Sequence, residues 1–170
     1  MCPSTEGPRG SGPAVGGAGQ LGAELLTQLR ARARAAHSRI VFPETQDDRI
    51  LQAAHYLRQE GIVDVVLVGE PGAIIARGRG LGLELEGTDI IDPATSGLRD
   101  WFAHNFYERR KHKGITEEEA HKSVVDPLFF GASMVKVGMC DGMVAGSMSP
   151  TANVIKAGLY CVGLAEGMKT

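Results

Sequence analysis

The sequence has little cysteine and no long apolar run. Its 170 residues contain three cysteines, Cys2, Cys140 and Cys161, and no CxxC pair. An odd and sparse set of this kind does not form a disulfide framework, and a structural zinc site is not expected without paired cysteines. No apolar stretch reaches the length of a membrane span. We therefore expect a cytoplasmic protein with reduced thiols and no membrane partner.

The sequence also lacks the short motifs of several enzyme classes. It contains no GxGxxG or Walker pattern, which argues against a dinucleotide-binding or P-loop enzyme. Local spacing identifies no Ser-His-Asp or Cys-His triad and no metal site. The formal net charge of −2 does not indicate a basic surface that binds nucleic acid. What is present, 22% charged and 43% hydrophobic residues, is ordinary for a globular domain with its own core.

The first residues are rich in glycine, proline and serine. Residues 1–19, MCPSTEGPRGSGPAVGGAG, have no apolar core segment, so they do not form a secretory signal, and their composition predicts a disordered tail over residues 1–20. The next segment, residues 21–39, is rich in arginine and has leucines at helical spacing. This pattern favours an amphipathic helix that caps the domain, with an organellar transit peptide as the weaker alternative.

Short apolar runs alternate with helical patterns along the rest of the chain. Residues 63–68, VDVVLV, are almost continuously apolar, which is typical of a parallel strand covered on both faces. The other predicted strands are residues 39–42, 88–91 and 142–145. Predicted helices cover residues 21–36, 47–59, 98–111, 128–137 and 151–164, a capping box at Thr116 begins another, and glycines weaken the helical pattern of residues 70–83. Alternation at this spacing indicates βαβ units, and hence an α/β fold with a parallel sheet and helices on both faces, an αβα sandwich.

Two loops follow predicted strands, at the edge where open α/β sheets bind their ligands. The first, residues 43–49, is PETQDDR, and the second, residues 146–153, is GSMSPTAN. The second leads into a helix N-terminus, where unpaired N–H groups and the positive end of the helix dipole attract anions. We therefore predict a phosphate site there, with Gly146, Ser147, Ser149, Thr151 and Asn153 as donors and Lys156 as a positive charge. The alternative is simple capping, because serine or threonine before a helix is expected without any ligand.

A dense basic cluster, ERRKHKG, occupies residues 108–114. It ends a predicted helix, where cations complement the negative end of the dipole, so one interpretation is a solvated helix end. The other interpretation is that an arginine of the cluster faces an anionic ligand, because a guanidinium binds phosphate oxygens in a bidentate way. Spacing alone leaves both interpretations open.

Several of these strings together resemble the phosphate acetyltransferase and phosphate butyryltransferase family. The strings are, in chain order, IVFPETQDDRILQAA, GIVDVVLVGEP, FYERRKHKGITEEEA, DPLFFGASMVKVGMCDGMVAGS and VGLAEGMKT, of which the third is the most specific. The resemblance covers residues 39–170 and implies a two-domain α/β enzyme, usually a homodimer, with its site in the cleft between the domains. On that basis residues 21–145 belong to the first domain, residues 146–170 begin the second, and the fold is incomplete relative to the family.

The resemblance also implies a reaction, the reversible transfer of acetyl between acetyl-CoA and phosphate, which forms acetyl phosphate and CoA. No bound cofactor or metal is implied. In the family an aspartate takes the proton of the CoA thiol, the thiolate attacks the carbonyl of acetyl phosphate, and arginines and a serine bind the phosphate. The serine, an arginine and the aspartate lie in the family's C-terminal half, beyond Thr170. We therefore expect the 170-residue chain to be inactive by itself and prone to aggregate or oligomerise.

Two residues fall on catalytic positions that the resemblance implies. Arg110 takes the place of the family arginine in the RKHKG string, and Lys156 takes the place of a second arginine, with Asn153 where aspartate is common. Lysine keeps the charge but loses the bidentate geometry. This difference and the altered loop before it motivate a second hypothesis, a non-catalytic acyl-CoA-binding domain like those fused to some malic enzymes.

Overall fold

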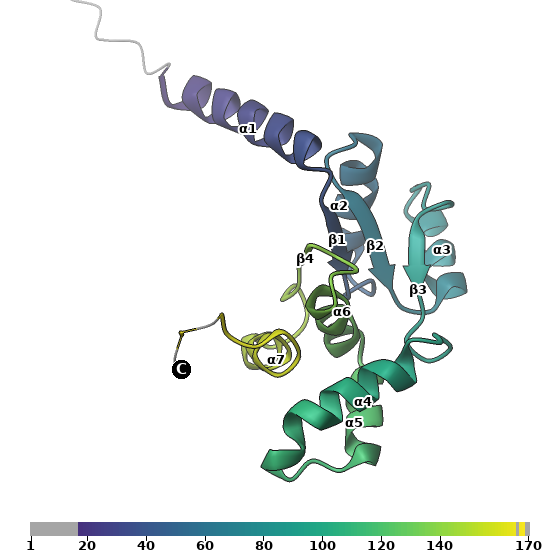
Figure 1. Ribbon diagram of the computed structural model, residues 1–170. Coiled ribbons are helices and arrows are strands. Elements are labelled where there is room, and N and C mark those ends of the chain that lie inside the picture. Colours follow the sequence, from purple (N-terminus) through teal and green to yellow (C-terminus); the bar gives the residue numbers. More distant parts are fainter. Residues whose placement is uncertain (1–16, 166, 169–170) are drawn as a thin grey trace, which may run out of the picture.

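The computed structural model describes residues 17–165, 167 and 168 of the chain. Helix α1 (Gly17–Ala36) begins inside the region predicted to be a disordered tail, and residues 1–16 of that tail lie outside the described residues. The helix ends beside His37, whose positive φ of 48° turns the chain toward strand β1 (Arg39–Phe42). Figure 1 shows α1 extending away from the rest of the chain.

The leucine face of α1 does not cap the domain. Its members are exposed, Leu25 at 57%, Leu26 at 53% and Leu29 at 48%. The helix contacts the domain through an ion pair of 2.8 Å from Arg34 to Glu60, and through the Arg30 guanidinium, 5.7 Å from the centroid of the Tyr56 ring. The predicted helix is thus confirmed, whereas the predicted capping is wrong, because polar contacts near its C-terminal end hold α1 in place. Among the described helices, none combines the length and the apolar character needed to cross a membrane.

The sheet has four parallel strands, as the α/β interpretation predicted. Its order is β3-β2-β1-β4, where β2 is Asp64–Val68, β3 is Asp89–Ile91 and β4 is Gly142–Met143. The chain proceeds from β1 outward through β2 to β3 and then returns to place β4 on the other side of β1. The strand order therefore reverses between β1 and β4. Ligands of open α/β sheets bind at such a point, outside the carboxyl ends of the strands.

Alternate residues of the central strands face opposite sides of the sheet. Val41 and Val66 belong to one buried cluster, whereas Phe42 and Leu67 belong to another. Helices α2 (Asp48–Gln59) and α3 (Pro71–Gly80) supply Leu51, Ala54 and Ile74 to the Phe42 side. Helix α6 (Pro127–Lys136) covers the Val41 side. It approaches closely at Gly131, where an added Cβ would lie 3.1 Å from the Met143 sulfur.

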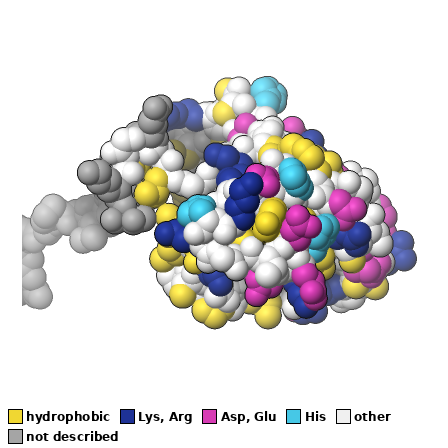
Figure 2. All heavy atoms as spheres, turned by 60° about the horizontal axis from the view of Figure 1, so that its bottom comes forward, with side chains coloured by type: hydrophobic (Ala, Val, Ile, Leu, Met, Phe, Trp, Pro, Cys, Tyr) yellow, Lys and Arg dark blue, Asp and Glu magenta, His cyan; other side chains and the backbone are white. Residues whose placement is uncertain are grey.

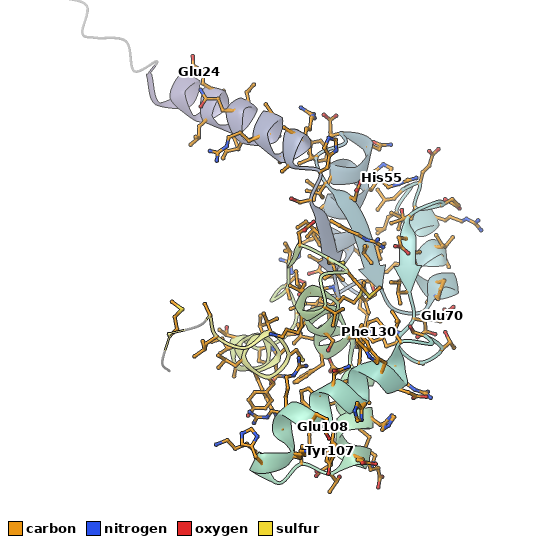
Figure 3. All side chains as sticks on the ribbon, viewed as in Figure 1. Glu24, His55, Glu70, Tyr107, Glu108 and Phe130 are labelled. Carbon is orange, nitrogen blue, oxygen red and sulfur yellow. The ribbon has the colours of Figure 1, made fainter. Side chains whose placement is uncertain are left out.

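A helical hairpin packs next to α6, at the lower end of Figure 1. Its helices are α4 (Arg99–Arg110) and α5 (Glu117–Val125), joined by a short 3₁₀ turn, η1 (Lys111–Lys113). Phe102 of α4 meets Phe130 of α6 edge to face, with ring centroids 4.9 Å apart, and Figure 3 shows Phe130 between the sheet and α4. The capping box predicted at Thr116 is confirmed, because its hydroxyl accepts from the Glu119 N–H and the Glu119 carboxylate accepts from the Thr116 N–H.

The last helical segment changes its winding part-way along. Helix α7 (Thr151–Ala157) begins where predicted, but a π-helical turn, η2 (Gly158–Val162), replaces its second half. The Gly163 N–H closes that turn by donating to the Gly158 carbonyl at 3.0 Å. Ala157 and Cys161 are fully buried against the Val41 side of the core. The wide turn therefore follows the packing surface rather than the helical pattern of the sequence.

Candidate functional site

The loops after β1 and β4 bind each other at the point where the strand order reverses. Glu44, which is only 7% exposed, follows β1 and places its carboxylate against the loop after β4. One carboxylate oxygen accepts from the N–H groups of Gly146 and Ser147, both at 2.7 Å, and from the Ser147 hydroxyl at 2.9 Å. The other oxygen accepts from the N–H groups of Met148 at 3.2 Å and Ser149 at 2.6 Å. The donors expected to face a phosphate thus surround an internal anion.

The hydrogen bonds determine the charge state of Glu44. Burial acts to raise its pKa, but the hydrogen bonds from Ser149 and Ser147 outweigh burial and lower the pKa from 4.5 to about 2. The carboxylate is therefore ionised at neutral pH. Such amide donors stabilise an anion in the same way whether it belongs to the chain or to a ligand.

An ion pair on the same loop reinforces this contact. The Asp47 carboxylate accepts from the Arg49 side chain, with a shortest distance of 2.6 Å, and caps α2 by accepting from the Arg49 N–H. The bonds from Arg49 hold the pKa of Asp47 well below its usual range. The same guanidinium donates to the Ser147 carbonyl at 3.3 Å. The segment from Glu44 to Arg49 thus accepts hydrogen bonds from N–H groups of the loop after β4 and donates one to a carbonyl of the same loop.

Arg110 and Lys156 meet at a different place, in a cavity of about 520 Å³ between the α4–α5 hairpin and the α7–η2 segment. Figure 3 labels Glu108, which precedes Arg110 by two residues near the end of α4. The walls of the cavity include aromatic side chains, four cations and one carboxylate: Phe106, Phe129, Tyr160, Arg110, Lys113, Lys122, Lys156 and Glu119. A positively charged cavity with aromatic walls is suited to an anionic ligand that also carries apolar or ring groups.

One tyrosine lies between the two predicted site cations. The Arg110 guanidinium carbon lies 3.6 Å from the centroid of the Tyr160 ring, and the Lys156 nitrogen lies 5.5 Å from it. Within the described residues, Lys122 pairs with Glu118, whereas Arg110, Lys113 and Lys156 have no carboxylate within ion-pair distance. Three of the four cations of the cavity therefore have no ion-pair partner among the described residues, although the Glu119 side chain also lines the cavity.

The positive charge of this cavity does not belong to a broad basic surface. On the face shown in Figure 2, dark-blue Lys and Arg side chains are interspersed with magenta Asp and Glu side chains. Charge of both signs on that face agrees with the formal net charge of −2. Anion binding would thus be local to the cavity.

The structure divides the predicted site residues into two groups. Arg110 and Lys156 line the cationic cavity, whereas Gly146, Ser147 and Ser149 surround Glu44. Ser149 also lines a smaller cavity of about 150 Å³ beside Glu44. Thr151 and Asn153 are exposed in the first turn of α7, and neither lines the cationic cavity.

The chain is similar to known proteins over most of its length. Residues 24–170 match the family described as phosphate acetyl/butaryl transferase. The chain belongs to this family. A phosphate acetyltransferase of Corynebacterium glutamicum is 44% identical over 137 residues, which cover 80% of this chain and 42% of the relative. One of Clostridium acetobutylicum is 36% identical over 146 residues, which cover 86% of this chain and 44% of the relative.

Solved structures of the family share the fold. A phosphotransacetylase of Streptococcus pyogenes superposes with a TM-score of 0.81 at 31% identity, over 87% of this chain and 45% of that one. The EutD phosphotransacetylase of Staphylococcus aureus gives a TM-score of 0.78 at 30% identity, over 87% of this chain and 44% of that one. The chain thus spans less than half the length of these family members, and the resemblance found in the sequence is confirmed.

Sequence reasoning missed two features of the site. Glu44 lay inside the first noted loop, but no local spacing connects it to Gly146, 102 residues later in the chain. Tyr160 follows Lys156 by one helical turn, a spacing that places both side chains on one face and could have been noticed. Its contact with Arg110, in contrast, joins two elements that are distant in the sequence. Among the described residues, no three His, Cys, Asp or Glu side chains form a group suited to a metal ion.

Proposed function

We propose that this chain supplies the CoA-binding and phosphate-binding part of a phosphate acetyltransferase, which reversibly forms acetyl phosphate and CoA from acetyl-CoA and phosphate. The observation that carries the proposal is the meeting of Arg110 and Lys156 in one cavity without an acidic partner in the described chain. Unneutralised cations in a partly apolar cavity bind phosphate groups more strongly than solvated ones do. Membership of the family supports the choice of reaction.

Within this proposal, Arg110 binds a phosphate of CoA or of acetyl phosphate through two N–H groups, and Lys156 adds a single charge. Both stabilise negative charge that develops during the transfer. Ser149, Thr151 and Asn153, with the amides of Gly146 and Ser147, remain candidates for substrate contacts. A phosphate can reach those amides only if Glu44 leaves them, because Glu44 already accepts their N–H groups.

The rest of the proposed catalytic machinery comes from outside these residues. The relatives are more than twice as long as the matched region, and the resemblance places a serine, an arginine and the proton-accepting aspartate beyond Thr170. We therefore expect negligible acetyl transfer by the 170-residue chain alone. We further propose a cytoplasmic homodimer for the whole protein, with no bound metal or cofactor and with small-molecule substrates.

The test of this function joins the chain to the segments that it does not cover. Residue 170 is fused to the remaining C-terminal part of the Corynebacterium glutamicum relative, which is 44% identical over the matched region. We expect this chimera to form acetyl-CoA from acetyl phosphate and CoA. Arg110→Ala should lower kcat/KM at least tenfold, which is about 1.4 kcal/mol of lost transition-state stabilisation.

Arg79→Ala is the matched control, because Arg79 lies on α3 and pairs with Glu86 far from the cavity. It should change kcat/KM less than twofold. An unchanged rate in the Arg110 variant would show that the arginine does not contact the reacting groups. Absence of transfer in the chimera, beside an active C. glutamicum enzyme, would contradict the proposed reaction itself.

A second candidate function is a non-catalytic domain that binds acyl-CoA. The contact between Glu44 and the loop after β4 favours it, because this contact leaves fewer free donors for phosphate. Calorimetry with acetyl-CoA distinguishes the two functions. Binding to the chimera together with transfer supports the enzyme, whereas binding without transfer supports the acyl-CoA-binding domain.

A further inference from the structure

Tyr160 connects the two halves of the cationic cavity. It lies in η2, and its neighbour Cys161 is fully buried, with its sulfur 3.6 Å from the Phe129 carbonyl of α6. This anchor and the π-helical turn fix the direction of the tyrosine. Such turns occur often at functional sites, because they shift side chains away from the positions of a regular helix. The ring thereby reaches across to Arg110 at the end of α4.

The contact between Tyr160 and Arg110 differs chemically from an ion pair. At 3.6 Å from the ring centroid, the guanidinium packs against the π-face, which attracts a cation through the ring quadrupole. The N–H donors of arginine all lie in the guanidinium plane, so stacking through its face does not use them. An aspartate at the same place would occupy these donors and cancel the charge. Tyr160 can therefore hold Arg110 in position and leave it able to bind an anion.

The same ring also stabilises a second cation. Lys156 lies one helical turn before Tyr160, with its nitrogen 5.5 Å from the ring centroid. Two positive charges beside one ring repel each other, and this repulsion falls when a ligand brings two negative charges between them. A diphosphate group meets that requirement better than a single carboxylate does.

From these contacts we propose that Tyr160 is a positioning residue that holds Arg110 and Lys156 as an unneutralised pair for a ligand with a diphosphate group. The proposal rests on the anion-binding role given to this cavity under the proposed function. It adds the residue that orients the cations and the ligand chemistry that they match. Burial alone would be an alternative role for the ring, since Tyr160 also packs against the core cluster around Val41.

The experiment measures the affinity of inorganic pyrophosphate for the 170-residue chain by calorimetry. Tyr160→Phe keeps the ring and should bind pyrophosphate within twofold of the unchanged chain. Tyr160→Leu removes the π-face and should weaken binding about fivefold to tenfold, the usual range for a partly desolvated cation–π contact. In an Arg110→Ala background, Tyr160→Leu should weaken binding less than it does in the unchanged chain, because the ring then acts through Lys156 alone.

The matched control removes a similar contact elsewhere. Tyr56→Leu deletes the ring beneath Arg30, 5.7 Å from its guanidinium, and should leave pyrophosphate binding unchanged. The upfield ring-current shift of the Arg110 Nε–H in NMR spectra provides a second measurement. It should persist in Tyr160→Phe and disappear in Tyr160→Leu. If Tyr160→Leu fails to fold, Tyr160→Met supplies the same test with an unbranched apolar side chain.

Three results would overturn the proposal. Equal binding by the unchanged chain and by Tyr160→Leu would leave the anion cavity intact but remove the role of Tyr160. An equal loss in the Arg110→Ala background would mean that the ring contributes only packing. Failure of the unchanged chain to bind pyrophosphate would contradict the anion-binding role of the cavity as well, so the two failures are distinguishable.

Discussion

Glu44 joins the loop after β1 to the loop after β4. Its carboxylate accepts five hydrogen bonds from residues 146–149, four of them from backbone N–H groups. These donors belong to half-buried and exposed residues, so without the carboxylate they must turn to water and the loop loses its link to β1. The residue therefore joins β1 to β4 more firmly than the two-residue β4 strand could by itself.

This arrangement predicts how stability depends on pH. Because the pKa of Glu44 is lowered in the folded chain from 4.5 to about 2, its contribution is complete above pH 4.5 and is lost as the pH falls toward 2. Glu44→Gln should lower the free energy of unfolding at pH 7 by about 2–3 kcal/mol. It should also flatten the dependence of stability on pH between 4.5 and 2. Urea unfolding at pH 7 and at pH 3 measures both effects.

Glu84→Gln is the control, since Glu84 is exposed and its carboxylate has no hydrogen bond within the described residues. The free energy of unfolding of the Glu84→Gln variant should equal that of the unchanged chain at both pH values. An unaltered pH profile for Glu44→Gln would mean that its carboxylate does not hold the loop after β4.

Among the elements, the α4–α5 hairpin determines where the cations of the cavity lie. The connection depends on Gly114, which has a φ of 83° and directly follows Lys113. That conformation is left-handed, where a residue with a Cβ is strained although nothing lies within 4 Å of the added atom. The strain thus comes from the backbone, not from a neighbouring side chain.

Gly114→Ala should therefore destabilise the chain by about 1–2 kcal/mol. Gly80→Ala is the matched control, because Gly80 ends α3 in a helical conformation and its added Cβ also meets nothing within 4 Å. This control should be neutral or up to about 1 kcal/mol more stable, because alanine favours the helix. Thermal unfolding of the two variants measures the difference. Equal stabilities would show that the turn does not require the left-handed conformation.

At the scale of the whole molecule, several exposed apolar side chains gather in each of two regions of the described chain. One is the leucine face of α1, and the other surrounds α7 and η2, with Met148 at 58%, Ile155 at 55% and Leu164 at 47% exposure. Exposed apolar groups that gather in one region favour association. This distribution supports the expectation that the 170-residue chain oligomerises when it is studied alone.

Sedimentation analysis can assign that association to one region. We expect the 170-residue chain to self-associate at micromolar concentration, and Leu25→Ser combined with Leu29→Ser to weaken the association at least fivefold, about 1 kcal/mol of lost apolar contact. Trp101→Ser is the control, because Trp101 is a similarly exposed apolar side chain, at 48%, on a different helix. A monomeric unchanged chain would contradict the prediction. Association that the leucine substitutions leave unaltered would exclude α1 as the interface.

The helices and strands could be predicted from the sequence because their causes are local. The apolar run before Pro43 predicted β1, and the Thr116 capping box predicted the start of α5. The ends of some elements differ from the predicted ends where tertiary packing competes with the local sequence pattern. The helix that begins at Thr151 was predicted to continue to residue 164, but a π-helical turn that contains the buried Cys161 replaces it from Gly158. Family membership could also be predicted, since several strings match in order.

The sequence by itself determined the α/β class, the parallel sheet and the basic end of α4, because periodicity, caps and composition act over a few residues. Only the tertiary structure decided which charges meet. Arg110 lies against Tyr160, and Glu44 lies against the loop at Gly146, across separations that no local pattern encodes. The physical reason is that both contacts arise when strands and helices from distant parts of the chain pack on one sheet. Tertiary packing therefore places Arg110 and Lys156, which have no ion-pair partner among the described residues, in the cavity. It also places an internal carboxylate against the loop that had been predicted to bind phosphate.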